Sequence, residues 1–300
     1  MAAGSGSRAV TCTSAIRISR ISWNEWKADA RVNDEFKMNQ FIRIEDAKGV
    51  GRVVLARPDL HNAFNEVMIA EITKAFADLC KRDEIRVIVL AGEGKSFSAG
   101  GDINWMKRMV GYTFEENVED ARGMAAMLRA IRDCPKPVIA RVHGAAIGGG
   151  VGLVAACDMA VALSSAVFCL SEVKLGIVPA VISPYVLEKI GIGAARRYAV
   201  TAEQFDAMEA KRIGLVSEVV SSIERLDAWI AKRCKAILAN APEATAVCKQ
   251  VMREVPSLGW DDARAFTTRT IAERRVSPEG QEGLKAFLEK RPPVWPGSPS

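Results

Sequence analysis

The sequence predicts an α/β fold in which short buried strands alternate with amphipathic helices. Residues 85–91 form a near-continuous apolar run, which is typical of a strand buried on both faces. Residues 66–81 carry apolar side chains at helical spacing, and two short strand-like segments, 41–44 and 50–55, precede them. This order of two strands followed by a helix indicates that sheets and helices pack in layers.

The composition is that of an ordinary globular protein. Of 300 residues, 49% are hydrophobic and 26% are charged, and the formal net charge is +5. This mild charge fits an anionic ligand, but no dense basic block demands nucleic acid. Aromatic residues make up only 6% and form no stripe with basic residues, so a nucleic-acid partner is not expected. No apolar run reaches membrane-spanning length.

The cysteine and histidine content bounds the chemistry further. Seven cysteines show no CxxC motif and no paired spacing, which favours a reducing compartment. Cys157 and Cys169 stand in apolar surroundings and are expected to be buried. With only His61 and His143 in the chain, we expect no histidine-based metal site.

Residues 1–37 differ in character from the rest. Up to Trp23 they contain three arginines, several serines and no acidic residue, which is typical of a transit peptide. An upstream extension before Met38 is the alternative, and we favour it. Either way we expect residues 1–37 to be poorly ordered. The expected location is the cytoplasm, or the mitochondrial matrix if the segment is a genuine transit peptide.

Turn and cap residues separate the elements expected in the first third of the chain. A turn is expected at 48–49, between the first two strands. Pro58 bars a helix and Asn62 suits a turn, so residues 57–65 are expected to form a loop. Asn65 is predicted to cap the helix that follows.

Residues 92–96 look briefly like a phosphate-binding loop. The Walker pattern needs a glycine five positions before Gly94, and that position is Val89. The spacing therefore excludes nucleotide hydrolysis of this type.

The stretch from residue 136 to 179 carries the strongest chemical signal. A strand is expected over 137–142, a helix over 151–156 and a second strand over 159–163, with a glycine cluster at 148–150. Backbone N–H groups at a helix N-terminus are unpaired and favour negative charge, and glycine lets a ligand approach closely. Together with Glu172, this stretch offers an oxyanion site and an acid/base residue.

The remaining elements are mostly helical. The pattern favours a helix over 114–132 and leaves 105–111 unassigned. A helical segment is expected from Ala202, and residues 213–220 resemble the last short strand of a known family named below. Further helices are expected over 226–240, 242–254 and 260–275, with a terminal segment at 277–290.

Seven pieces of the chain, in this order and spacing, together resemble the crotonase (enoyl-CoA hydratase/isomerase) superfamily. The pieces are residues 57–65, 97–103, 136–140, 148–150, 157–158, 172–179 and 282–291. The resemblance covers about residue 38 to the end. It implies a spiral of ββα turns over 38–225, then a helical region over 226–300 that makes trimer contacts. It implies an acyl-CoA thioester substrate, with coenzyme A as part of the substrate and no other cofactor, and a homotrimer or dimer of trimers.

The resemblance also implies roles for single residues. The N–H groups of Gly101 and Gly149 would polarise the thioester carbonyl, and Glu172 would be the acid/base. Taken alone, Glu172 better suits a surface position near Lys174, and Asp102 equally suits a cap for the following turn, a role compatible with ligand binding. The residues implied along coenzyme A are Ala63, Ala99, Gly101, Asp102, Ile103, Gly149, Phe287 and Lys290, the last two from this or a neighbouring subunit.

One departure from the resembled pattern bears on the mechanism. Family hydratases carry a second glutamate two residues after the glycine cluster, where this chain has Gly152. Three interpretations remain open. Glu172 acts alone on water, helped by a polar group such as Ser183, Tyr185 or His143; or the enzyme is an enoyl-CoA isomerase that shuttles one proton; or the protein only binds acyl-CoA.

We rank these interpretations in that order. Residues 169–176, 179–184 and 194–198 resemble bacterial hydratases that act on branched glutaconyl-CoA thioesters in leucine and acyclic-terpene breakdown. The resemblance implies that some of these hydratases also have glycine at the position of Gly152. A glutaconyl substrate would need a basic partner in the acyl pocket, and the sequence identifies none.

Overall fold

The computed structural model describes residues 31–32 and 39–295. Most of the predicted extension, residues 1–37, lies outside this range. Within it, Arg31–Val32 forms β1, which pairs antiparallel with β2 (Ile42–Ala47). In the described part of the chain, no helix is long and apolar enough to cross a lipid bilayer.

The larger sheet orders the fold. Among the described residues it has 7 strands in the order β1-β2-β3-β4-β5-β7-β10. The strands from β3 onward run parallel, whereas β1, β2 and β3 pair antiparallel. Their bounds are β3 (Val50–Leu55), β4 (Val87–Gly92), β5 (Val138–Val142), β7 (Met159–Leu163) and β10 (Glu218–Val220).

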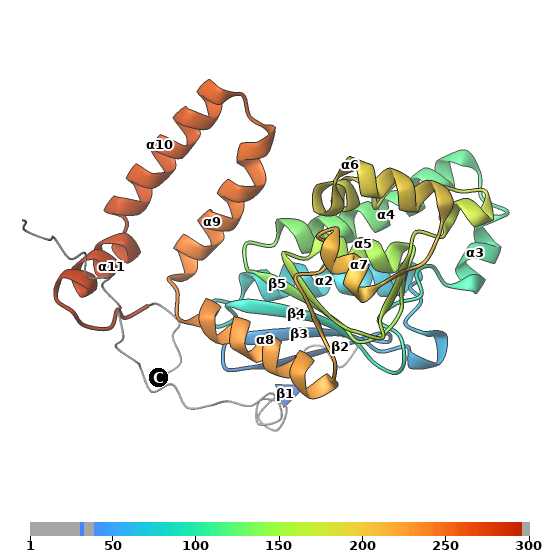
Figure 1. Ribbon diagram of the computed structural model, residues 1–300, viewed down its shortest axis with the longest axis horizontal. Helices are drawn as coiled ribbons and strands as arrows, with labels where there is room; N and C mark the ends of the chain where they lie inside the picture. The colour runs from blue at the N-terminus through green and yellow to red at the C-terminus, as the bar shows by residue number, and fades with distance from the viewer. Residues whose placement is uncertain (1–30, 33–38, 296–300) are drawn as a thin grey trace, which may run out of the picture.

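Both faces of this sheet are buried, as the apolar run at 85–91 predicts. Along β4, Ile88 and Leu90 join the main core, while Val87 and Val89 pack in a second cluster on the opposite face. Helices α2 (Glu66–Lys81), α4 (Phe114–Asp133) and α5 (Gly149–Ala156) supply the main core. Helix α8 (Ile223–Leu238) covers the other face (Figure 1).

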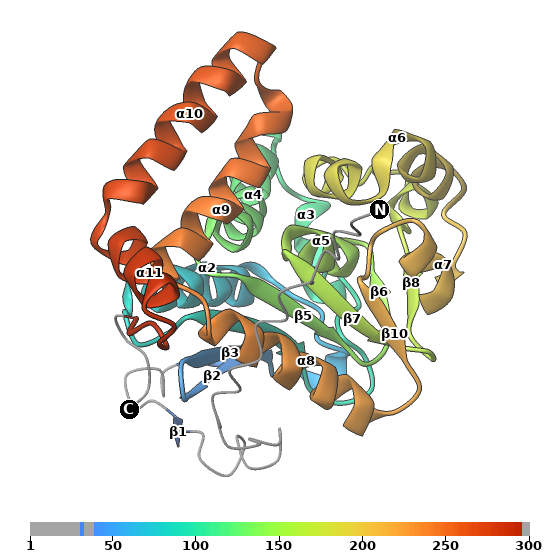
Figure 2. The same cartoon turned by 60° about the vertical axis from the view of Figure 1, so that its left-hand side comes forward.

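A second, 3-stranded sheet lies beside α5. It consists of β6 (Ala146–Ile147), β8 (Val167–Cys169) and β9 (Phe205–Asp206) in the described chain, and its central strand is β8. Phe168 stacks on Phe205 with a centroid distance of 5.6 Å, which joins β8 to β9. Around this sheet lie η3 (Glu172–Leu175), α6 (Ser183–Thr201) and α7 (Ala207–Arg212) (Figure 2).

Most of the predicted elements are confirmed within a few residues. Asn65 caps α2 as expected, since its side chain accepts from the N–H of Met68. The segment left unassigned is α3 (Ile103–Met109). The prediction of a helix starting at Ala202 is wrong: α6 ends there, with Ala202 in a left-handed conformation at φ 48°. The sequence pattern hides α6 because Gly191, at φ 70°, kinks it in the middle.

The C-terminal helices form an arm that projects from the core. It comprises α9 (Pro242–Glu254), η4 (Val255–Ser257), α10 (Trp260–Val276) and α11 (Pro278–Leu288), and the two views agree that α9 and α10 stand away from the sheet (Figures 1 and 2). No residue of α9 or α10 is buried. Trp260 is 93% exposed at the start of α10.

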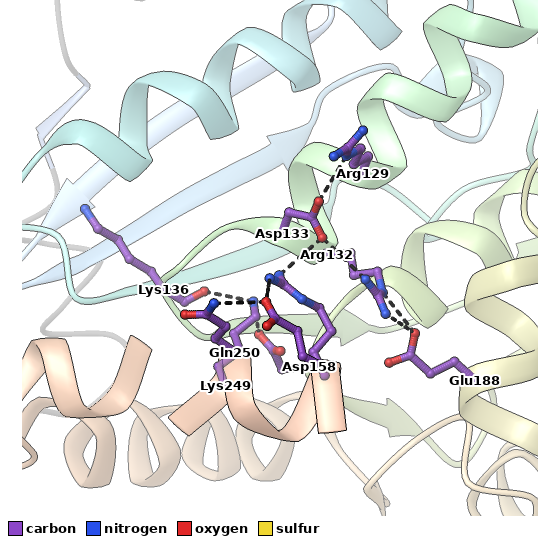
Figure 3. A network of polar contacts seen from close by, with 10 residues as sticks. Arg129, Arg132, Asp133, Lys136, Asp158, Glu188, Lys249 and Gln250 are labelled. Carbon is purple, nitrogen blue, oxygen red and sulfur yellow. Dashed lines mark hydrogen bonds and ion pairs between the residues drawn. The ribbon is translucent and has the colours of Figure 1, made fainter. Parts of the chain in front are cut away.

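A polar network fixes the arm to the core (Figure 3). Lys249 and Arg253, one turn apart on α9, reach the core carboxylates of Asp158 at 2.7 Å and Asp133 at 3.2 Å. The same oxygen of Asp158 accepts the N–H of Val138, the first residue of β5. Lys249 also donates to the backbone oxygen of Lys136. The arm is therefore tied to the point where β5 and β7 begin.

Removing the Lys249 ammonium tests this anchoring. Lys249→Met keeps the aliphatic stem but leaves Asp158 without its cation, so we expect the free energy of unfolding to fall by about 1–3 kcal/mol. Amide exchange in α9 should accelerate. Lys74→Met is the matched control, because Lys74 is 69% exposed in its ion pair with Asp78. Equal losses in the two variants would contradict an anchoring role for Lys249.

Candidate active site

Two loops meet at the carboxyl ends of the parallel strands. One follows β4 and covers residues 93–102; the other follows β5 and covers 143–148, where α5 begins. The strands β4 and β5 are direct neighbours, so their following loops emerge at the same edge of the sheet. This edge brings the loop at 93–102 next to the glycine cluster at 148–150.

Asn62 holds the first loop from beneath. Its amide is fully buried and donates to the backbone oxygens of Glu93 and Ser96, each at 2.8 Å. Its side-chain oxygen accepts the N–H of Arg57. Asn62 adopts the left-handed conformation at φ 54°, which asparagine tolerates better than most residues. The predicted turn residue thus also organises the loop that follows β4.

The N–H of Gly101 is left free by the bonds around it. Phe64 donates to the oxygen of Gly100 at 2.8 Å and accepts from the N–H of Asp102 at 2.9 Å. These two bonds use the groups on either side of Gly101. Among the described residues, the Gly101 N–H donates to no backbone acceptor.

The N–H of Gly149 lies close to the same loop. Gly149 is the first residue of α5, so its N–H has no partner within the helix. Gly148 precedes it at φ 53°, a conformation that favours glycine. A Cβ placed on Gly100 would lie 3.5 Å from the Gly149 nitrogen. Two unpaired N–H groups, at Gly101 and Gly149, are therefore presented by loops in direct contact.

Glu172 brings a carboxylate to this place. It is the first residue of η3, and its Oε1 lies 3.2 Å from the position that a Cβ on Gly148 would take. Its Oε2 is buried and has no hydrogen-bond partner. Burial raises the pKa of the Glu172 carboxyl above its usual value. Such a group is suited to proton transfer near neutral pH.

The position of the expected second carboxylate is closed by an apolar side chain. A Cβ on Gly152 would lie 2.9 Å from the Cβ of Ile182 and closer still to its Cγ2. Leu128 stands on the other side at 3.7 Å. Both Gly152 and Ile182 are buried. Glycine at 152 is thus matched to isoleucine at 182, and no other side chain fits there without a shift.

None of the three polar helpers considered from the sequence has a hydrogen bond to Glu172. Ser183 donates to the oxygen of Ala180 at 2.8 Å. His143 bonds the oxygen of Gly94 through Nε2, and burial lowers its pKa. Tyr185 is half-buried. Burial raises its pKa, and the charge of Asp133, the last residue of α4, raises it further. Glu172 stands without a polar side-chain partner in the described chain.

Asp102 has a structural role that the sequence predicts and an ion pair that it does not. The carboxylate caps α3 by accepting the N–H groups of Asn104 and Trp105. Arg57 donates to its other oxygen at 2.7 Å. Burial alone would raise the pKa of Asp102, but these hydrogen bonds outweigh it and the pKa is lowered. Arg57 is the first residue of the motif at 57–65, but that motif does not identify Asp102 as its partner.

The other residues implied for ligand binding fall into two groups. Ala63 and Ala99 border the loop described above, where the N–H of Ala99 donates to the oxygen of His61. Ile103 is 71% exposed at the start of α3. Phe287 and Lys290 instead lie at the C-terminal end of the chain, in and just after α11. In Figure 1, α11 and α3 lie on opposite sides of the molecule.

The sequence and fold of the chain are similar to those of known proteins. The family model described as enoyl-CoA hydratase/isomerase matches residues 45–298. The structure of an enoyl-CoA hydratase from Shewanella pealeana is similar with a TM-score of 0.83 and 41% identity, covering 86% of this chain and 97% of that one. The chain is 33% identical to the short-chain-enoyl-CoA hydratase of Clostridium acetobutylicum over 262 residues, which are 85% of this chain and 97% of the relative. It is 31% identical to a peroxisomal Δ3,5-Δ2,4-dienoyl-CoA isomerase of Arabidopsis thaliana over 270 residues, which are 87% of this chain and 97% of the relative.

The two glycines with free N–H groups should respond differently to an added methyl group. At Gly101 a Cβ would meet the flexible end of Met106 at 2.9 Å, so we expect Gly101→Ala to change the free energy of unfolding by less than about 1 kcal/mol. At Gly149 it would enter the ring of Phe64, so Gly149→Ala should cost about 1–3 kcal/mol. Urea unfolding measures both values. Equal stability of the two variants would show that Phe64 yields more easily than the packing implies.

Proposed function

The chain belongs to the enoyl-CoA hydratase/isomerase family and is an enzyme, and we propose that it adds water across the 2,3 double bond of an enoyl-CoA thioester. The observation that carries the proposal is the half-buried Glu172, whose Oε1 lies beside the N-terminus of α5 and whose Oε2 has no hydrogen-bond partner. Coenzyme A enters as part of the substrate, and the reaction needs no other cofactor.

In the proposed mechanism, the thioester oxygen accepts hydrogen bonds from the N–H groups of Gly101 and Gly149. Negative charge that develops on this oxygen is stabilised by dipoles that are already in place. Loss of one such donor typically costs about 2.7–4 kcal/mol of transition-state stabilisation. Ala63, Ala99, Asp102 and Ile103 would follow the pantetheine and nucleotide parts of the ligand.

Glu172 would carry the proton in both half-steps. Its carboxylate takes a proton from water as the water oxygen bonds to C3, and the electrons of the double bond move onto the thioester as an enolate. The protonated Glu172 then returns the proton to C2, which regenerates the carboxylate. Burial supports this exchange, because it raises the carboxyl pKa towards neutral pH.

For the acyl group, we propose a branched glutaconyl thioester as the first substrate to test, with a short unbranched enoyl group as the comparison. Support for the branched acyl group comes from the sequence resemblance of residues 169–176 and 179–184. One relative of this chain is named a short-chain-enoyl-CoA hydratase, which supports a small acyl group more generally.

A second candidate is enoyl-CoA isomerisation, and the closed position at Gly152 favours it. Ile182 fills the space of a second carboxylate, so a single group must carry the chemistry. Moving a double bond requires one carboxylate to carry a proton between two carbons, with no water. A relative named as a dienoyl-CoA isomerase supports this alternative. Binding of acyl-CoA without turnover is the third candidate.

We also propose that the active protein is a homotrimer or a dimer of trimers. Phe287 lies in α11 and Lys290 just after it, and Figure 1 shows α11 on the opposite side of the molecule from α3, so these residues would reach a nucleotide bound to a neighbouring copy. Exposed apolar side chains on the arm support such an assembly, because patches of this kind mark interfaces. They are Met252, Trp260, Ile271, Val276, Leu284, Phe287 and Leu288.

The direct test follows the loss of enoyl-thioester absorbance with 3-methylglutaconyl-CoA and with crotonyl-CoA. We expect hydration of at least one of them, and a decrease of about 10²–10⁴-fold in Glu172→Gln, which keeps the shape but not the acid/base group. Glu115→Gln, in the exposed first turn of α4, is the matched control. Absence of hydration with both thioesters would refute the proposal, and conversion of a 3-enoyl-CoA would then support the isomerase.

The raised pKa of Glu172 makes a separate prediction for stability. Because the folded-state pKa exceeds the unfolded one, ionised Glu172 destabilises the fold, and this penalty develops as pH rises above about 4.3 towards the folded pKa. Glu172→Gln should therefore raise the melting temperature at pH 7 and lose that advantage near pH 4. Calorimetry across this range measures the effect. A variant that melts below the parent at pH 7 would contradict the unpaired, buried state of Glu172.

A further inference from the structure

Helix α3 has one buried side chain. Of its residues Ile103–Met109, Trp105 alone is buried, at 4% exposure. The indole N–H of Trp105 donates to Oδ1 of Asp120 on α4 at 2.9 Å. Asp120 is half-buried. Met106 and Met109 are partly buried, and Met109 packs against the main core, but the hydrogen bond from α3 to α4 comes from Trp105.

The same ring packs against the peptide that carries the free N–H. Two atoms of the Trp105 indole lie 3.7 Å from the position of a Cβ on Gly101. The indole also meets the ring of Phe64 at a centroid distance of 6.2 Å, tilted by 57°. Phe64 holds the residues on either side of Gly101 through its backbone. The side chain of Trp105 therefore packs beside Gly101, and the main chain of Phe64 bonds the residues before and after Gly101.

Asp120 is placed to fix the indole rather than to react. Desolvation raises its pKa; the Trp105 hydrogen bond and Arg108 oppose this shift, and the charge of Glu66 adds to it. Arg108 and Glu66 are joined to each other in an exposed ion pair at 2.6 Å. Among the described residues, the indole N–H of Trp105 is the one hydrogen-bond donor to the Asp120 carboxylate.

We propose that Trp105 and Asp120 are positioning residues that hold the N–H of Gly101 in the geometry needed to stabilise an oxyanion. The inference rests on the oxyanion site of the proposed function. Without the indole hydrogen bond, α3 and the preceding peptide gain freedom, and the donor spends less time aimed at the ligand. Binding of the CoA portion should change less than enolate stabilisation, because Asp102 keeps its ion pair with Arg57 when the indole hydrogen bond is lost.

The test uses a readout that does not require turnover. Acetoacetyl-CoA loses its C2 proton to give an enolate with strong ultraviolet absorbance, so the apparent pKa of the bound ligand reports on the oxyanion donors. We expect Trp105→Phe and Asp120→Leu each to raise this pKa by about 1 unit, equal to a tenfold loss of enolate stabilisation. Asp120→Asn keeps an oxygen acceptor and should match the parent. The double variant Trp105→Phe/Asp120→Leu should lose no more than either single one.

Controls separate positioning from general destabilisation. Trp295→Phe removes another indole hydrogen bond, to the oxygen of Ala239 at 2.9 Å near the arm, and should leave the enolate pKa unchanged. For substrates that turn over, kcat should fall about tenfold in Trp105→Phe with KM within about twofold. Unchanged enolate binding in Trp105→Phe, or an Asp120→Asn variant as impaired as Asp120→Leu, would overturn the inference.

The outcome for the parent protein distinguishes the two proposals. If the parent stabilises the enolate but hydrates nothing, the hydratase proposal fails and the positioning inference stands on the variants. If the parent binds acetoacetyl-CoA without stabilising its enolate, the oxyanion site fails and the inference with it.

Discussion

The close approach of two backbone segments determines the rest of the site. Residues 98–101 press against residues 147–150 so tightly that side chains are excluded between them. A Cβ on Gly100 would lie 2.8 Å from the oxygen of Ile147, and one on Gly150 would lie 2.5 Å from the oxygen of Ser98. The parallel register of β4 and β5 brings these segments to one edge, and glycine permits the final contact. The contact places the free N–H groups of Gly101 and Gly149 in adjacent segments.

Much of the fold could be predicted because its local signals agree with its packing. Helix α2 has an Asn65 cap, a clear apolar face and no internal glycine, and its predicted bounds hold. Helix α6 has no such agreement: Pro184 near its start and Gly191 and Gly193 within it break the pattern that defines a helix in sequence. Helix α3 is too short and too exposed for periodicity to identify it.

The resemblance to the crotonase superfamily implies roles for Gly101, Gly149 and Glu172, and those roles stay predictions. The structure brings together the segments that carry these residues, but the sequence did not indicate the contacts around them. The match of Gly152 with Ile182 joins positions that are far apart in sequence, and no local pattern records it. The same holds for Arg57 with Asp102 and for Trp105 with Asp120. Such pairs depend on how helices and loops pack, which composition and periodicity do not encode.

The proposed oxyanion site uses main-chain donors, and this has a consequence for divergence. Substitution of a side chain does not delete an N–H group, so ordinary point mutations leave this part of the chemistry in place. Matched pairs outside it, such as Gly152 with Ile182, can change together around it. A lineage with this scaffold can therefore drift from one thioester reaction to another without passing through a form that no longer polarises its substrate.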